Sequence, residues 1–151
     1  MSKVVLDTNI LVSALIIKEG KPARIVMFAR EGKFECVLSE EIIEEARTIF
    51  HRKHIQKRFH PSEEEIEEFL GALQDVSTFV SIQNVENVIT ADESDNVVLA
   101  CAVEGGAEYL VSGDLHFLNL KSHRNVKMVT PAQFLEILKT ITATSQGEES
   151  Q

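Results

Sequence analysis

Short apolar runs rich in β-branched residues recur along the chain and predict buried strands. Most of these runs are bounded by Gly, Pro, Ser, Asp or Asn, which are residue types that favour turns and helix caps. The predicted strands are Lys3–Leu6, Phe34–Leu38, Glu108–Val111 and Val126–Val129, with Phe79–Ile82 as a further short candidate.

Between these runs, apolar residues recur every three or four positions, which is the spacing of one helix face. Ser39 is placed to cap one such segment, and Ser62 and Glu65 have the spacing of a capping box at the start of another. The predicted helices are Ile10–Ile17, Pro22–Arg30, Ser39 to about Arg52, Pro61 to Val76, Asn96–Val103 and Pro131 to about Ile141.

Strands and helices alternate through most of the chain. This order predicts an α/β fold with three layers, α/β/α, in which helices cover both faces of a mostly parallel sheet of four to five strands. Ligands of such sheets bind beyond the carboxyl ends of the strands. Asp7 and Asp114 both fall at that edge.

Length and composition fit one domain. A chain of 151 residues with 44% hydrophobic and 26% charged residues can bury a core without disulfide or zinc staples. We expect the domain to span residues 1–141 and residues 142–151 to form a loose, flexible tail. Cys36 and Cys101 lie inside apolar runs, which predicts buried thiols in a reducing compartment. The apolar run Ile10–Ile17 is far shorter than the roughly 20 residues that span a bilayer, so we expect a cytoplasmic protein without a membrane segment.

The formal net charge of −9 has the wrong sign for a protein that holds nucleic acid by a general basic surface. Phosphates could then be bound only through cations in an acidic cluster or through a local basic patch. The chain offers both. Its one concentrated basic stretch is His51–His60, which contains Arg52, Lys53, Lys57 and Arg58.

Several acids are spaced to meet at the carboxyl edge of the sheet. Asp7 and Asp114 each follow a predicted strand. Glu45 comes six residues after Ser39, which places it about 9 Å along its helix, where its side chain can lean back over the edge. Asp92 and Asp95 are three residues apart at a helix start and can share a face.

Such a cluster is unfavourable unless cations fill it, because close carboxylates repel and raise one another's pKa. Hard oxygen ligands select Mg²⁺ or Mn²⁺. A carboxylate-bound pair of these ions can activate water and stabilise both reacting oxygens in phosphodiester hydrolysis. The acids therefore predict a metal-dependent hydrolase.

Four segments together resemble the PIN domain (PilT N-terminus) family. They are the strand end Val4–Asn9, the helix start Ser39–Glu45, the segment Asp92–Asn96 before an apolar helix, and Tyr109–Asp114. The closing stretch Val126–Leu135 is also similar to the end of that domain. The resemblance covers residues 1 to about 140 in the right order and spacing.

The resemblance implies a metal-dependent endoribonuclease, often the toxin of a toxin–antitoxin pair and often a homodimer, which binds RNA and an antitoxin protein. By position it implies four metal ligands, in the order Asp7, Glu45, Asp95 and Asp114. It also implies residues that orient these carboxylates or touch substrate, namely Thr8, Asn9 and Ser112. Asp92 is a better candidate than Asp95 for the cap of its helix and could also orient the metal-binding carboxylates or touch substrate. Ser112 replaces the family's usual Thr and keeps the hydroxyl. His116 and Phe117 stand where an acidic or polar residue is common, and we assign them no role.

Each assignment has a structural alternative. Asp7 and Asp114 could serve as a helix cap and a turn residue, and Glu41 competes with Glu45 for the metal. The basic stretch could be a solvated loop, or it could bind RNA or an acidic partner segment.

Two other functions compete with the ribonuclease. A catalytically idle binding module is disfavoured because all four acids are present. An aspartate-based phosphotransfer enzyme is disfavoured because such enzymes usually carry a second Asp two residues after the nucleophile, and that position is Asn9.

Overall fold

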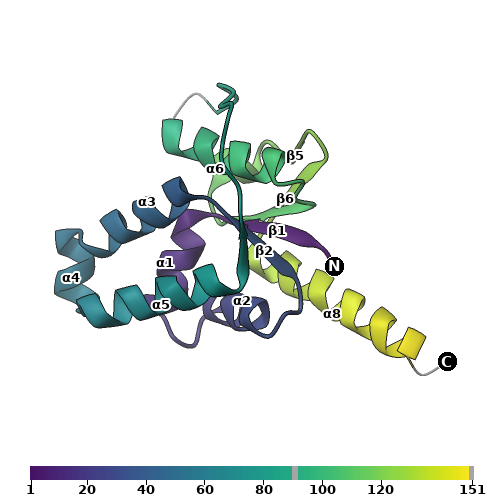
Figure 1. Ribbon diagram of the computed structural model, residues 1–151, viewed down its shortest axis with the longest axis horizontal. Helices are drawn as coiled ribbons and strands as arrows, with labels where there is room; N and C mark the ends of the chain where they lie inside the picture. The colour runs from purple at the N-terminus through teal and green to yellow at the C-terminus, as the bar shows by residue number, and fades with distance from the viewer. Residues whose placement is uncertain (90–91, 150–151) are drawn as a thin grey trace.

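A six-stranded sheet forms the centre of the molecule (Figure 1). The computed structural model describes residues 1–89 and 92–149, with side chains as far as Ile141. In spatial order the strands run β3-β2-β1-β4-β6-β5; all neighbouring pairs are parallel except β5 and β6. The strands are β1 Lys3–Leu6, β2 Glu35–Leu38, β3 Ser77–Phe79, β4 Tyr109–Val111, β5 Ser122–His123 and β6 Val126–Val129.

Helices cover both faces of this sheet, which confirms the predicted three-layer α/β/α fold. Helix α6 packs against β1, β2 and β4 on one face, and α1, α2 and α8 form the layer on the other (Figure 1). Helix α3 contacts α1, α5 and α6. The helices are α1 Thr8–Ile16, α2 Lys21–Arg30, α3 Glu40–Phe50, α4 Lys53–Phe59, α5 Glu63–Asp75, α6 Glu93–Glu104, α7 Leu115–Leu118 and α8 Pro131–Glu149.

The sheet has six strands rather than the expected four to five. The additional strand, β5, has two residues, too few for any alternation of apolar and polar side chains to show. Strand β3 begins at Ser77, two residues before the expected strand Phe79–Ile82, and it ends at Phe79. It begins earlier because α5 ends at Asp75 and pairing with β2 begins at Ser77.

Two short helices were not expected, and the largest extensions beyond the expected bounds are those of α6 and α8. The basic stretch, read as a loop in one alternative, forms α4; only Ile55 of this helix is buried, so its apolar pattern is weak. Helix α7 has one turn. Helix α6 begins at Glu93, before the apolar pattern starts. Helix α8 continues through Glu149, so residues 142–149 of the expected loose tail are helical, and the last two residues of that tail lie outside the described part of the chain.

Local capping explains where the long helices begin. The Ser39 hydroxyl accepts a hydrogen bond from the Ile42 amide at the start of α3. Ser62 and Glu65 form the predicted capping box of α5, with each side chain bonded to the other residue's amide. Both cysteines are buried free thiols, as predicted. Among the described residues no helix is both long and apolar enough to cross a membrane.

The pairing of β1 with β4 fixes what meets at the carboxyl edge. Leu6 pairs with Val111 in the parallel register, so the next residues, Asp7 and Ser112, stand side by side where the two strands end. The Asp7 amide extends the ladder by donating to the Val111 carbonyl at 2.9 Å. The pairing of the two strands therefore places the Asp7 carboxylate next to the Ser112 hydroxyl.

Candidate metal centre

Asp7 is the most enclosed acid of the edge. It is 4% exposed and occupies the position before α1, yet its side chain caps no amide of that helix. Instead, its Oδ2 accepts a hydrogen bond of 2.8 Å from the Ser112 hydroxyl. The Asp7 carboxylate is therefore held toward β4.

Ser112 connects two of the acids. It is fully buried, and its Oγ accepts a 2.9 Å hydrogen bond from the Asp114 amide while its hydroxyl donates to Asp7. Asp114 in turn begins α7, and its Oδ1 accepts from the His116 amide at 2.9 Å. The Ser112 hydroxyl thus links Asp7 to the backbone of Asp114 and fixes the position of the turn that carries the Asp114 side chain.

Helix α6 brings the third acid from the other side. Asp92 caps this helix, with its Oδ1 accepting from the amide and the hydroxyl of Ser94. Asp95, in the first turn of the helix, is 8% exposed. Asn96 is buried beside it and ties the preceding segment to the helix: its amide group bonds the backbone of Val88 and Ile89.

Asp95, Asp114 and His116 form a compact group. One oxygen or ring nitrogen from each of the three side chains lies within 4.8 Å of the other two. His116 Nδ1 is 3.2 Å from Asp95 Oδ2 and 3.6 Å from Asp114 Oδ1. The group joins two distant segments, the start of α6 and the turn after β4.

Glu45 approaches from α3. Its side chain is half-buried, whereas Glu41 is exposed and Glu44 is paired with Arg47 on the outer face of the helix. Burial and the charges of Asp92 and Asp95 raise the pKa of Glu45, an effect that Arg52 and a hydrogen bond with Ser94 partly oppose. Glu45 therefore faces the N-terminus of α6.

The acids at the carboxyl edge of the sheet are electrostatically unfavourable in their ionised form when no cation is bound. Burial, assisted by Asp95 and Asp114, raises the pKa of Asp7 to about 6 despite the bond from Ser112. Burial also raises the pKa of Asp95, with Asp92 and Asp114 adding to the effect and His116 opposing it. Asp7, Asp95 and Glu45 thus resist ionisation for the same reasons: lost solvation and like charge.

A family model described as PIN domain matches residues 3–116, which is most of the chain. The chain belongs to the PIN domain family. PIN domains are nucleases that generally use divalent metals. This one is similar to an uncharacterised protein of Methanocaldococcus jannaschii, which is 29% identical over 142 residues that cover 89% of this chain and 90% of the relative.

The acids of this PIN domain fit a hard divalent cation. Asp7, Asp95 and Asp114 supply carboxylate oxygens, the ligand type that Mg²⁺ and Mn²⁺ prefer. The Thr8 hydroxyl, next to Asp7, is buried and has no hydrogen-bond partner among the described residues. A hydrated ion would relieve both the repulsion among the acids and this unpaired hydroxyl.

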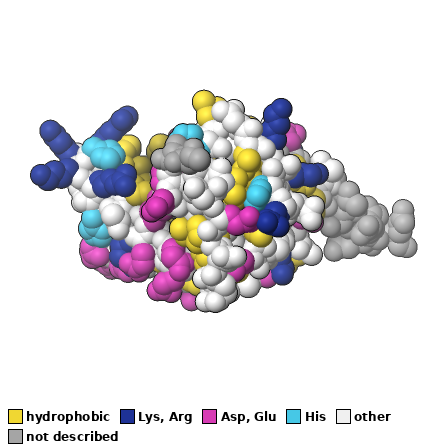
Figure 2. Space-filling model, turned by 90° about the horizontal axis from the view of Figure 1, so that it is seen from above, with side chains coloured by type: hydrophobic (Ala, Val, Ile, Leu, Met, Phe, Trp, Pro, Cys, Tyr) yellow, Lys and Arg dark blue, Asp and Glu magenta, His cyan; other side chains and the backbone are white. Residues whose placement is uncertain are grey.

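Other residues expected at the site lie outside this compact group. Asn9 is exposed and makes no side-chain hydrogen bond within the described part of the chain. The basic segment, defined here as Arg52, Lys53, Lys57 and Arg58, is exposed on and just before α4. Lys and Arg side chains gather at the end of the molecule formed by α4, on the left of the space-filling view (Figure 2). Of these cations, Arg52 acts on the pKa of Glu45.

The structure adds residues that sequence reasoning missed. His116 contacts two acids, Ser94 contacts Asp92 and Glu45, and Asn96 secures the segment before α6. A signal existed for Asn96, a polar residue within an otherwise apolar helix run. No comparable signal marks His116 in the sequence, because the direction of its ring depends on the single turn of α7.

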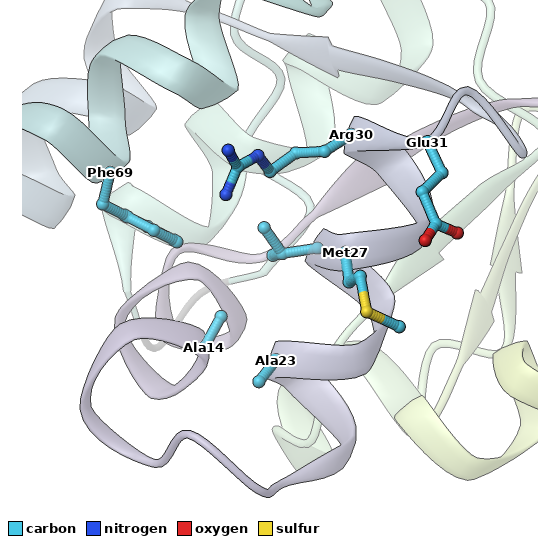
Figure 3. A pocket seen from close by; sticks show the side chains of 7 residues that line it. Ala14, Ala23, Met27, Arg30, Glu31 and Phe69 are labelled. Carbon is cyan, nitrogen blue, oxygen red and sulfur yellow. The ribbon is translucent and has the colours of Figure 1, made fainter.

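A separate hollow of about 430 Å³ lies between α1, α2 and α5 (Figure 3). The Arg30 side chain extends across it toward Phe69, and Met27 and Ala23 border it from α2 (Figure 3). None of the acids at the sheet edge lines this hollow. It is therefore distinct from the candidate metal centre.

The buried carboxylate predicts a pH-dependent cost in the metal-free protein. The pKa of Asp7 is raised from 3.8 to about 6, so between these values the native state binds more protons than the unfolded state, and stability falls as the pH rises. In chelator at pH 7, Asp7→Asn should therefore raise the free energy of unfolding by about 1–3 kcal/mol, and the gain should vanish toward pH 4.

Chemical denaturation of both proteins from pH 4 to 7 measures this difference. Asp75→Asn, which changes an exposed acid at the end of α5, is the control and should show no such gain. If Asp7→Asn is less stable than the wild type at pH 7 without metal, the carboxylate is not held at an electrostatic cost.

Proposed function

We propose that this PIN domain is an Mg²⁺- or Mn²⁺-dependent endoribonuclease that hydrolyses RNA phosphodiester bonds at the carboxyl edge of its sheet. The observation that carries the proposal is the meeting of buried Asp7 and Asp95 with half-buried Asp114 at this edge, where the raised pKa values of Asp7 and Asp95 favour a cation. No pattern of nucleophile and base is needed for this chemistry.

Each side chain has a defined task in the proposal. Asp7, Asp95 and Asp114 hold the metal, and Ser112 fixes the orientation of both Asp7 and Asp114. Glu45 completes the set from α3, while Asp92 and Ser94 fix the start of α6. When bound, the ion supplies Lewis acidity and a nucleophile at neutral pH. Thr8 and Asn9 follow Asp7 in the chain, and we propose that they contact metal-bound water or substrate.

The RNA is held by local rather than global charge. The acidic chain repels phosphates, so the substrate backbone must meet cations near the site. The basic segment follows the helix that carries Glu45, and Arg52 is close enough to affect the pKa of that acid. We propose that RNA extends from the acids over α3 to the basic segment.

Activity should require the metal and each ligand. Asp7→Asn, Asp95→Asn and Asp114→Asn should each lower cleavage of a mixed RNA pool more than about 100-fold. Mg²⁺ or Mn²⁺ should support turnover, whereas Ca²⁺ should bind without doing so, because its looser coordination misplaces the reacting groups. Since water is the nucleophile, the products should carry 5′-phosphate and 3′-hydroxyl ends.

Glu45→Gln and Glu41→Gln form the matched control pair on one helix. The first should lower activity like the Asp variants, and the second should not, since Glu41 is exposed. Cleavage that persists in chelator, or products with a 2′,3′-cyclic phosphate, would contradict the proposal. A silent Glu45→Gln beside an inactive Glu41→Gln would transfer the role to Glu41.

The basic segment should control RNA affinity without controlling metal affinity. Replacing all four residues with Gln should weaken RNA binding and flatten its dependence on salt, by about 0.7 in the slope of log K against log salt for each phosphate that is no longer bound. The control replaces four exposed cations away from the site with Gln, namely Lys3, Lys21, Arg24 and Lys33. Equal slopes for the two variants would mean that RNA binds elsewhere.

The resemblance to single-domain PIN toxins supports a cellular role as the toxin of a toxin–antitoxin pair, acting as a homodimer with an antitoxin protein as partner. Expression of the wild type should then arrest growth of a bacterial host, and expression of Asp114→Asn at the same level should not. Light scattering of the purified protein tests the dimer. Growth that is unaffected by an active wild-type enzyme would exclude the toxin role and leave the ribonuclease.

A further inference from the structure

His116 points its ring into the acidic group. Its Nδ1 lies 3.2 Å from Asp95 Oδ2 and 3.6 Å from Asp114 Oδ1, while 46% of the side chain remains exposed. Two donors on one small ion are separated by at most about twice the bond length, or roughly 4.2 Å for Mg²⁺. Both separations fall within that limit.

The local backbone holds the ring in this place. The His116 amide donates to Asp114 Oδ1 at 2.9 Å, which fixes the residue at the start of α7. The next residue, Phe117, is fully buried and anchors the same turn in the core. The ring therefore faces Asp95 because the helix that carries it is held both at its cap and in the core.

We infer that His116 binds the catalytic ion through Nδ1, together with Asp95 and Asp114, and that this nitrogen makes the centre select Mn²⁺ over Mg²⁺. The inference rests on the proposed function, since it assigns a ligand to the same centre. Mg²⁺ is a hard ion that favours oxygen donors, whereas imidazole nitrogen strengthens the binding of transition metals. An acid at this position would provide oxygen instead.

Three variants separate this role from a merely structural one. His116→Asn removes the imidazole from an exposed side chain, and His116→Asp replaces the nitrogen donor with oxygen. His54→Asn, which changes an exposed histidine on α4, is the matched control. Mn²⁺ and Mg²⁺ affinities are measured by calorimetry without RNA, and pulsed electron paramagnetic resonance of the Mn²⁺-loaded proteins detects a coordinated ¹⁴N.

The wild type and His54→Asn should show the ¹⁴N coupling and prefer Mn²⁺. His116→Asn should lose the coupling, and its Mn²⁺ to Mg²⁺ affinity ratio should fall about tenfold or more. His116→Asp should also lose the coupling and bind Mg²⁺ more tightly than His116→Asn does.

Two results would overturn the inference: no ¹⁴N coupling in the wild type, or an affinity ratio unchanged by His116→Asn. If His116→Asn leaves the ratio unchanged but weakens RNA binding in chelator, the ring contacts substrate phosphate instead and the inference is equally overturned. Failure of the proposed function looks different. In that case neither ion binds the wild type, or ions bind and RNA is not cleaved.

Discussion

The parallel pairing of β1 with β4 is the constraint on which the site depends. Because Leu6 lies opposite Val111, the strands end together, and Asp7 meets Ser112 without any contribution from loops. Ser112 then bonds the Asp114 amide, so the position of a second acid follows from the first. A shift of one residue in this register would turn Asp7 away from Ser112 and separate the acids.

The same arrangement makes the ionised acids destabilise the metal-free fold, although the proposed function requires them to be ionised. Burial makes the Asp7 carboxylate hard to ionise, and Asp95 and Asp114 make it harder still. A bound divalent cation would resolve this conflict, since it would replace lost solvation with direct coordination. In the proposed function, a chain with net charge −9 would act on a polyanion because its acids would bind cations at the point of reaction and the basic segment lies on and just before α4.

Much of this could be predicted from sequence because it depends on local signals. Lys3–Leu6 and Val126–Val129 form strands with the predicted bounds, and the Ser62–Glu65 capping box is present. The placement of Asp7 and Asp114 at one edge followed from parallel topology alone. The orientation of His116 could not be predicted, because it depends on α7, a single turn held by Phe117 in a core assembled from distant segments. The helical form of the basic stretch could not be predicted for a similar reason: Ile55 is the one buried residue of α4, and Phe59 is only partly buried against the core.

The most direct test of the account is a crystal structure of the protein with Mn²⁺, with the ion located by its anomalous scattering. The account predicts a peak within coordination distance of Asp7, Asp95 and Asp114, with the Ser112 hydroxyl still bonded to Asp7. A peak elsewhere on the surface, or no peak at an Mn²⁺ concentration that supports RNA cleavage, would contradict the claim that these three carboxylates form the metal centre.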